Sequence, residues 1–382
     1  MEIIANRALR AAVAVLSLCA LPAYAGTYVY VSNADDGDIG VYTLQADGEL
    51  AAGARAAAAK LVMPMAVSPD RKYLYAAVRS KPFSVIQYAI DAKTGALRQL
   101  SSSPLAESFP YISTDKTGRF LFGASYGGHV VSVNPIGADG RVGEPAQVIP
   151  TGRNAHSVRI DGSNRFVFVP TLGSDQIFQF VFDAKSGKLA SNTPAVFLMK
   201  QGVGPRHFLT SADNRFVYVL SELQASVTSF ALDAKTGLLT EVSSVSGLPA
   251  DTKLGPGMPR GAVGTPGANQ APRNTDNDVW AADLHMTPDE RFLYISERTG
   301  NTINTLSVDK ASGKLAYVGS VATEKQPRGF AIDPKGRFLV ACGEKSETLS
   351  VYSIDQASGA LKLLKQYPGG KGANWIEIVS TD

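Results

Sequence analysis

The residues best suited to chemistry are a histidine, a glutamate and three arginines: His156, Glu222, Arg206, Arg298 and Arg328. An imidazole and a carboxylate can exchange protons near neutral pH, as general acid–base catalysis requires. A guanidinium group presents a rigid fork of N–H donors that suits an anionic or polarised oxygen. These residue types together could support attack at a carbonyl carbon, with the arginines stabilising the negative charge that develops on its oxygen.

The positions of these five residues indicate one shared site. His156, Arg206 and Arg328 each lie ten residues before an aromatic residue that recurs along the chain. Glu222 and Arg298 each lie six residues after such an aromatic. Each residue alone could equally be a surface ion pair or a hydrogen-bonded structural histidine. The common register favours function, because unrelated surface pairs have no reason to share it.

Three further residues are candidates of lower rank. Arg79 occupies the same register position as Glu222 and Arg298. Asp283 and His285 lie on an expected inner strand, so lining the channel is an equally good explanation for them. No G-x-S-x-G elbow, P-loop, cysteine pair or closely spaced histidine pair is present, so we expect neither a metal nor a cofactor.

The elements that position these residues belong to a pattern repeated seven times. Each repeat has an aromatic anchor, usually after Arg or Lys, and a glycine 20 to 22 residues later. Successive anchors are 45, 47, 46, 50, 76 and 46 residues apart. The anchors are Tyr28, Tyr73, Phe120, Phe166, Phe216, Phe292 and Phe338.

A period near 46 residues with about four short β-rich segments is typical of a β-propeller blade. The sequence therefore predicts an all-β fold, a seven-bladed β-propeller with four-stranded antiparallel blades. The first repeat supplies only three strands, and the C-terminal segment NWIEIVS is left unmatched. We expect Trp375 to Ser380 to complete the blade that begins at Thr27 and so to close the ring. Both register positions then fall at one mouth of the central channel.

Two segments lie outside the repeats. Residues 1–25 combine two arginines, an apolar run and Ala23-Tyr24-Ala25, as in a signal peptide for export to the periplasm, which would leave 26–382 as a single domain. Residues 247–278 form a Gly- and Pro-rich insertion on the side of the predicted site. This insertion is either a surface excursion or a flap over the site.

Composition excludes several partners. The chain has 37 Lys and Arg residues and 34 Asp and Glu residues, a net charge of +3. So small an excess of positive charge does not indicate binding to nucleic acid. The apolar run is too short for stable membrane insertion. After cleavage only Cys342 would remain, so no disulfide within the chain is expected. The oligomeric state is not readable.

Six segments resemble the seven-bladed propeller lactonases, which include bacterial 6-phosphogluconolactonase and the fungal carboxymuconate lactonizing enzymes. The resemblance covers essentially the whole mature chain. It implies acid–base roles for His156 and Glu222, substrate-holding roles for Arg206 and Arg298, and no required cofactor. The segments are NAHS (154–157), GPRH (204–207), SEL (221–223), WAADLH (280–285), ERT (297–299) and QPRGF (326–330).

We therefore expect hydrolysis of a small-molecule sugar lactone, with D-glucono-1,5-lactone in the periplasm as the first substrate. Three alternatives stay open: a 6-phosphogluconolactonase, a lactonizing cycloisomerase and a non-enzymatic periplasmic binding propeller. Whether His156 or Glu222 acts as the base also stays open.

Overall fold

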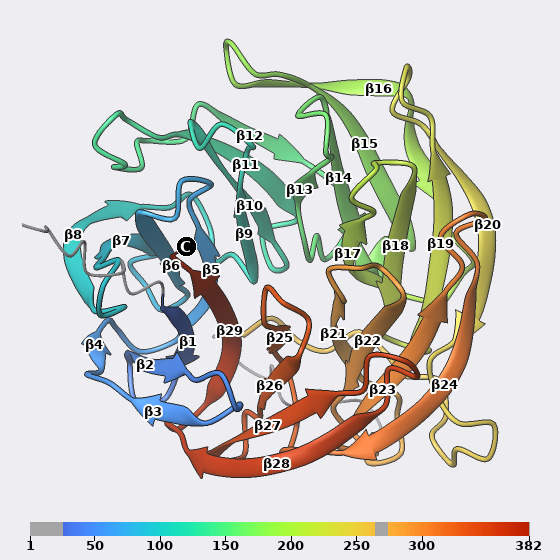
Figure 1. Cartoon of the computed structure of the whole chain (residues 1–382). Helices are drawn as coiled ribbons and strands as arrows, with labels where there is room; N and C mark the ends of the chain where they lie inside the picture. The colour runs from blue at the N-terminus through green and yellow to red at the C-terminus, as the bar shows by residue number, and fades with distance from the viewer. Residues whose placement is uncertain (1–25, 264–273, 382) are drawn as a thin grey trace, which may run out of the picture.

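The computed structural model describes residues 26–263 and 274–381, and these form seven antiparallel sheets around a central channel (Figure 1). Each sheet is one blade, ordered from an inner strand at the channel to an outer strand at the rim. The prediction of a seven-bladed propeller with four-stranded blades is confirmed.

The first three blades follow this plan with small variations. Blade one contains β29 (Ala373–Ser380), β1 (Thr27–Asn33), β2 (Asp38–Leu44) and β3 (Leu50–Ala52), and β4 (Ala56–Ala57) also pairs with β2. Blade two contains β5 (Val62–Val67), β6 (Tyr73–Val78), β7 (Ser84–Ile90) and β8 (Leu97–Pro104). Blade three contains β9 (Tyr111–Thr114), β10 (Phe120–Ser125), β11 (Val130–Pro135) and β12 (Gln147–Pro150).

The other four blades are more regular. Blade four contains β13 (Arg159–Ile160), β14 (Phe166–Thr171), the short 3-10 helix η1 (Leu172–Ser174), β15 (Gln176–Asp183) and β16 (Lys188–Leu198). Blade five contains β17 (Pro205–Thr210), β18 (Phe216–Ser221), β19 (Ser226–Leu232) and β20 (Leu239–Ser246). Blade six contains β21 (Ala281–Met286), β22 (Phe292–Glu297), β23 (Thr302–Val308) and β24 (Leu315–Ala322). Blade seven contains β25 (Phe330–Ile332), β26 (Phe338–Cys342), β27 (Thr348–Ile354) and β28 (Leu361–Pro368).

The ring closes as the sequence predicts. β29 pairs antiparallel with β1 over its whole length, from Thr27 opposite Ser380 to Asn33 opposite Ala373. The closure is extended by Thr381, whose backbone N–H donates to the Gly26 carbonyl at 3.0 Å. β1 therefore has a partner strand on both sides, and the two ends of the array are joined in one sheet.

The repeated aromatic and glycine explain how one blade packs on the next. The glycine of each blade touches the aromatic anchor of the blade before it. Gly237 of blade five has φ +71°, and a Cβ there would lie 2.1 Å from the Phe166 ring of blade four. Only glycine fits so close an approach in that conformation. Gly48 of blade one lies against Phe338 of blade seven in the same way, so this contact runs around the entire ring.

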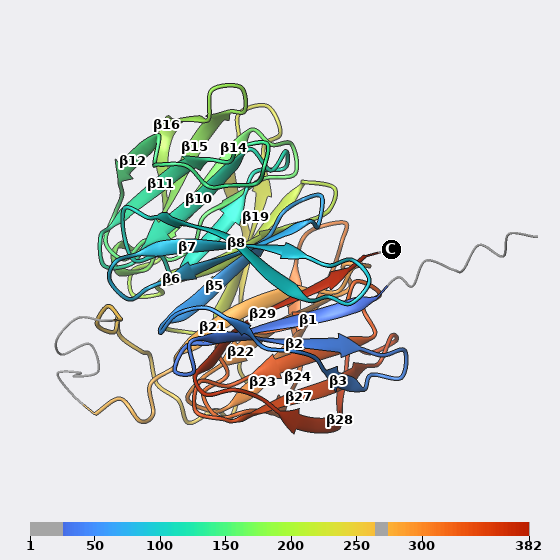
Figure 2. The same cartoon turned by 90° about the vertical axis from the view of Figure 1, so that its left-hand side faces the viewer.

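The propeller has two distinct faces (Figure 2). The described parts of the 247–278 insertion lie on one face, and the described chain ends, Gly26 and Thr381, lie on the other. In each blade the inner strand runs from the first face to the second. It follows the outer strand of the preceding blade in the chain, and that outer strand ends at the first face. No helix in the described ranges is long and apolar enough to cross a membrane. Residues 1–25, expected to be a signal peptide, lie outside the described residues.

Candidate active site

Local irregularities in two inner strands place charged side chains at the channel mouth. The pairing of β17 with β18 shifts register between Pro205 and His207, so Arg206 lies in a bulge. β21 has a similar shift between Ala281 and Leu284. Bulges re-aim side chains that regular alternation would send to the opposite faces of a sheet.

The centre of the site is a carboxylate held by two arginines. Arg206 Nε donates to Glu222 Oε2 at 2.7 Å, and Arg298 Nη2 donates to the same oxygen at 2.9 Å. Arg206 is fully buried, and Glu222 and Arg298 are 3% and 6% exposed. Burial and the nearby Arg298 lower the pKa of Arg206 to about 9. Both arginines donate to Oε2. Glu222 Oε1 accepts no hydrogen bond from the parts of the chain that the structure describes.

His156 lies beside this group with an uncommitted ring nitrogen. Its ring centroid is 5.6 Å from that of Tyr126 and 5.1 Å from that of His207, and Nδ1 is buried without a hydrogen-bond partner. Burial, followed by the charges of Arg206 and His207, holds the pKa of His156 well below its ordinary value. The imidazole is therefore neutral at pH 7, a state in which it can accept a proton.

A second cationic group adjoins the first. Arg328 Nε lies 3.5 Å from Glu344 Oε1, and Arg328 Nη1 is buried without a partner. Arg79 is 3% exposed and donates to Ser108 Oγ at 3.0 Å, and burial followed by the charge of Arg328 lowers its pKa to about 9. Glu344 is close enough to Arg298, and Arg328 to Arg206, for their charges to affect the pKa values of those arginines, so the two groups occupy one end of the channel.

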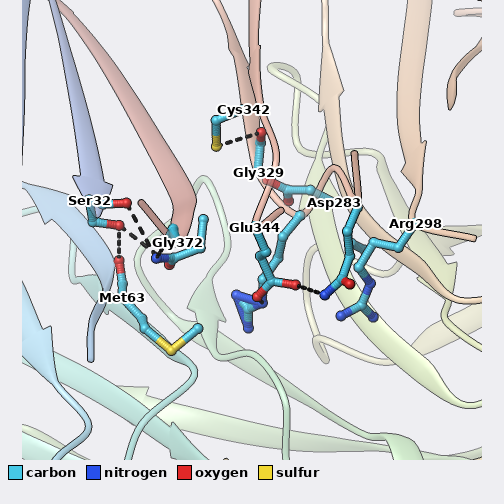
Figure 3. A network of polar contacts seen from close by, with 12 residues as sticks. Ser32, Met63, Asp283, Arg298, Gly329, Cys342, Glu344 and Gly372 are labelled. Carbon is cyan, nitrogen blue, oxygen red and sulfur yellow. Dashed lines mark hydrogen bonds and ion pairs between the residues drawn. The ribbon is translucent and has the colours of Figure 1, made fainter. Parts of the chain in front are cut away.

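The described chain contains no group of three His, Cys, Asp or Glu side chains arranged to hold a metal ion. Cys342 is buried, and its thiol donates to the Gly329 carbonyl at 3.3 Å (Figure 3). Burial raises the pKa of this thiol, so it is protonated and unreactive. The chemistry of this end of the channel therefore belongs to arginine, glutamate and histidine.

Comparison with known proteins identifies the family. Residues 22–378 match the family described as "Lactonase, 7-bladed beta-propeller". The chain belongs to the seven-bladed β-propeller lactonases. The 6-phosphogluconolactonase of Pectobacterium carotovorum subsp. carotovorum is 38% identical over 355 residues, 93% of this chain and 99% of that protein. That of Serratia proteamaculans is 39% identical over 352 residues, 92% of this chain and 98% of that protein.

A solved structure gives the same answer. The periplasmic gluconolactonase of Pseudomonas aeruginosa superposes with a TM-score of 0.80 at 27% identity, covering 94% of this chain and 99% of that one. The protein is therefore a lactone-hydrolysing enzyme, and a non-enzymatic binding propeller is excluded.

The structure of the lactonase separates the predicted site residues into two sets. Six come together at the channel mouth, and Asp283 and His285 lie deeper on β21. Asp283 Oδ2 contacts His285 Nε2 at 3.2 Å. These two residues line a cavity of about 480 Å³ in the channel, on the far side of His207 from the arginines. The six are His156, Arg206, Glu222, Arg298, Arg328 and Arg79.

His207 is a residue that sequence reasoning missed. Its Nε2 lies 3.0 Å from Arg206 Nη1, and its Nδ1 lies 2.8 Å from Asp283 Oδ1. Since arginine can only donate, Nε2 accepts and Nδ1 donates, which fixes the tautomer. Burial and the charge of Arg206 lower the pKa of His207 to about 3, so the ring is neutral. The only indication in the sequence was its position directly after Arg206. In a regular strand consecutive side chains point to opposite faces, so His207 would not have been expected to contact the same site as Arg206.

The described part of the insertion covers this mouth of the lactonase channel. Gly257 N–H donates to the Leu223 carbonyl at 2.8 Å, and the Tyr126 hydroxyl donates to the Arg260 carbonyl at 2.7 Å. The Trp280 ring lies between two guanidiniums, with Arg298 at 3.7 Å and Arg260 at 4.5 Å from its centroid. The insertion therefore contacts an arginine of the site through Trp280.

Proposed function

We propose that this lactonase hydrolyses a six-carbon sugar 1,5-lactone at the arginine end of the channel, and that it prefers the 6-phosphate form. The observation that carries the proposal is the buried pair of arginines on Glu222, with neutral His156 beside them. Two donors remain available there, because Arg206 Nη2 and Arg328 Nη1 are buried without partners. Buried polar groups are normally hydrogen-bonded, so these two are suited to receive substrate oxygens.

The mechanism starts from the neutral imidazole. His156 accepts a proton from water as the water oxygen attacks C1 of the lactone, and the carbonyl oxygen becomes an oxyanion. Arg206 Nη2 stabilises that charge, a contribution of about 3–4 kcal/mol for one well-placed donor. The bond from C1 to the ring oxygen then breaks, and His156 returns its proton to the leaving ring oxygen. The product is the open-chain sugar acid.

Glu222 serves this mechanism by orienting the arginines. Its Oε2 accepts a hydrogen bond from both guanidiniums, so it holds Arg206 and Arg298 next to each other. We therefore favour His156 as the proton acceptor, whereas the sequence left the choice open. Glu222 Oε1 would help by accepting a hydrogen bond from the attacking water.

The preference for a phosphate follows from the charges at the site. Among the described residues, the ion pairs of Arg206, Arg298 and Arg328 use two carboxylates, Glu222 and Glu344, and Arg79 has none. Glu297 and Asp283 act on Arg298 and Arg206 only through longer-range charge. Asp283 is engaged by two histidines instead. The excess of positive charge favours a substrate that carries an anionic group of its own. The relatives named 6-phosphogluconolactonase support the same substrate.

The unphosphorylated glucono-1,5-lactone is the second candidate and was the first expectation from the sequence. It is favoured by the likeness to the periplasmic gluconolactonase of Pseudomonas aeruginosa and by the export signal expected in residues 1–25. We propose export to the periplasm on the same sequence pattern. Intact-mass analysis of a periplasmic fraction checks it, since a chain that starts at Met1 there would contradict cleavage.

The test compares both lactones on the mature protein by proton release, each corrected for spontaneous hydrolysis. Each charge-assisted contact contributes about 1.5–3 kcal/mol, so kcat/KM should favour the 6-phosphate by tenfold or more. Arg79→Gln should reduce that ratio, and the exposed Arg119→Gln is the matched control. Equal kcat/KM for the two lactones would favour the second candidate. Activity only on a muconolactone would indicate a cycloisomerase instead.

A further inference from the structure

The cavity at the other end of the channel has no role in the reaction described above. Its volume is about 480 Å³, and all seven inner strands contribute to its walls. It extends to the turn after β9, where Lys116 is exposed, so its mouth is on the face that carries Gly26 and Thr381. Small-molecule sites typically enclose about 300–1,000 Å³. The cavity is therefore large enough for a six-carbon ligand.

One wall of this cavity is cationic. Lys116 and Arg159 both line it; partial burial of the Lys116 side chain and then the charge of Arg159 lower the pKa of Lys116, and the charge of Asp161 opposes them. Neither forms an ion pair with any residue in 26–263 or 274–381. Arg159 Nη1 donates a long hydrogen bond to the Phe208 carbonyl at 3.4 Å, and its guanidinium also interacts with the Tyr111 hydroxyl. The charges of Asp161 and Glu377 reach Lys116 and Arg159 only from beyond ion-pair distance, so these two adjacent cations are suited to bind an anion directly.

The opposite wall is acidic and aromatic. Glu377 on β29 accepts one hydrogen bond, from Trp375 Nε1 at 2.8 Å, and burial raises its pKa to about 7. His285 and Asp283 lie on β21 beside it. Trp375 contributes a ring whose centroid is 5.3 Å from that of Tyr111, which lies on β9 in the cationic wall. Figure 1 shows β9 and β13 across the channel from β21 and β29, so the two walls face each other.

We propose that this cavity binds an aldonate, an open-chain six-carbon polyhydroxy carboxylate. The carboxylate would meet Lys116 and Arg159, and the hydroxyl groups would meet Glu377 and His285. Aromatic rings such as Trp375 suit the apolar C–H surface of a sugar chain. An apolar ligand would leave Lys116, Arg159 and Glu377 without a polar partner from the ligand, and a simple anion would use only the cationic wall.

The choice of an aldonate over other hydroxy acids rests on the proposed function, because an aldonate is the product of that reaction. The position of the site does not rest on it. The protein has two tryptophans, and they separate the two ends of the channel. Trp280 stacks on Arg298 at the arginine end, and Trp375 lines the cavity.

The experiment is a fluorescence titration with gluconate of two variants that each keep one tryptophan. Trp280→Phe retains only Trp375, and its fluorescence should change saturably as gluconate is added. Trp375→Phe retains only Trp280, and its fluorescence should not report this binding. Calorimetric titration of the unmodified protein gives the affinity independently, in case either variant folds poorly. Saturable binding reported only by Trp280 would place gluconate at the arginine end and overturn the proposal.

Side-chain variants sharpen the test. Arg159→Gln and Glu377→Gln should each weaken gluconate binding by roughly tenfold or more, and Arg119→Gln on the same face should not. Neutral glucose should bind at least roughly tenfold more weakly than gluconate. Inorganic phosphate binding as tightly as gluconate, or Arg159→Gln binding gluconate normally, would overturn the proposal. Lactone hydrolysis is measured in a separate assay. Failure of gluconate to bind in the cavity would therefore not contradict the proposed hydrolysis, and failure of hydrolysis would not contradict the binding result.

Discussion

Arg206 and Glu222 form a buried ion pair of 2.7 Å, and Arg298 joins it through the same carboxylate oxygen. The two arginines approach from different blades, Arg206 from blade five and Arg298 from blade six. Removing one partner from such a group leaves an uncompensated buried charge, which costs about 3–5 kcal/mol. Stability and catalysis therefore depend on the same atoms here, and each experiment needs a control that separates them.

Glu222→Gln should lower kcat/KM by roughly 10²-fold, because the amide holds the two guanidiniums less strongly than the carboxylate does. The matched control is Glu324→Gln. Glu324 is 3% exposed and accepts hydrogen bonds from Thr348 and Ser350, away from the arginines. Both variants should lose free energy of unfolding, measured in urea, but only the first should lose turnover. Equal turnover in the two would remove Glu222 from the site.

His156→Gln should lower kcat by roughly 10²-fold or more, the scale of general base catalysis. The depressed pKa of His156 keeps its free base present in mild acid. The kcat of the unaltered enzyme should therefore stay level from pH 8 down to about pH 5.5, below the ordinary histidine pKa of about 6.5. An initial-rate profile that falls with a midpoint near pH 6.5 would contradict this assignment.

Arg206→Lys and Arg298→Lys should each raise KM and lower kcat, with kcat/KM falling roughly 10- to 100-fold. Lysine keeps the charge but loses the planar fork that reaches Glu222 and the substrate together. Arg119→Lys, at an exposed turn, is the control for the substitution itself. An unchanged KM in both site variants would show that these arginines do not hold the lactone.

The stability of the fold should depend on pH through two buried histidines and the half-buried Glu377. His156 and His207 have lowered pKa values, His207 to about 3, so the unfolded chain binds their protons first as pH falls below about 6.5. Glu377 has a raised pKa of about 7, so the folded chain holds its proton where the unfolded chain has lost it. Between about pH 5 and 6 the two histidines make stability rise with pH, and Glu377 opposes them.

The net rise is at most about 1.4 kcal/mol per pH unit, since one proton per unit corresponds to that free energy. Glu377→Gln removes the opposing group, so the rise should approach about 2.7 kcal/mol per pH unit. Urea unfolding at about pH 5 and 6 measures both slopes. A shallower slope in the variant than in the parent protein would show that the signs are wrong.

The sequence predicted the fold because the residues that recur in each repeat contact one another in the structure. Phe166 and Gly237 recur at fixed spacing since they touch across blades, and a shift in that spacing would break the contact. The site was predicted in part for a related reason. The start of an inner strand and the end of the second strand lie at the same face, so His156, Arg206 and Glu222 could be grouped from register alone.

The remaining features depend on geometry that register does not contain. The bulge at Arg206 turns both it and His207 toward the channel, which regular alternation forbids. The sequence already offered channel lining as an explanation for Asp283 and His285, and both line the cavity, but the contact of Asp283 with His207 could not be read from register. The order of the two candidate lactones changed because the relatives are named 6-phosphogluconolactonase and because Arg79 lies close enough to Arg328 to feel its charge.

The contact between Gly48 and Phe338 makes blade one and blade seven neighbours of the same kind as any other pair. Gly26 and Thr381 are already hydrogen-bonded, so joining them by a short peptide would leave the ring intact. A circular permutant that is opened instead at the exposed turn of Lys93 and Thr94 should fold and keep its lactonase activity. The stability of the folded ring should therefore depend on the contacts between neighbouring blades and not on which blade contains the chain ends.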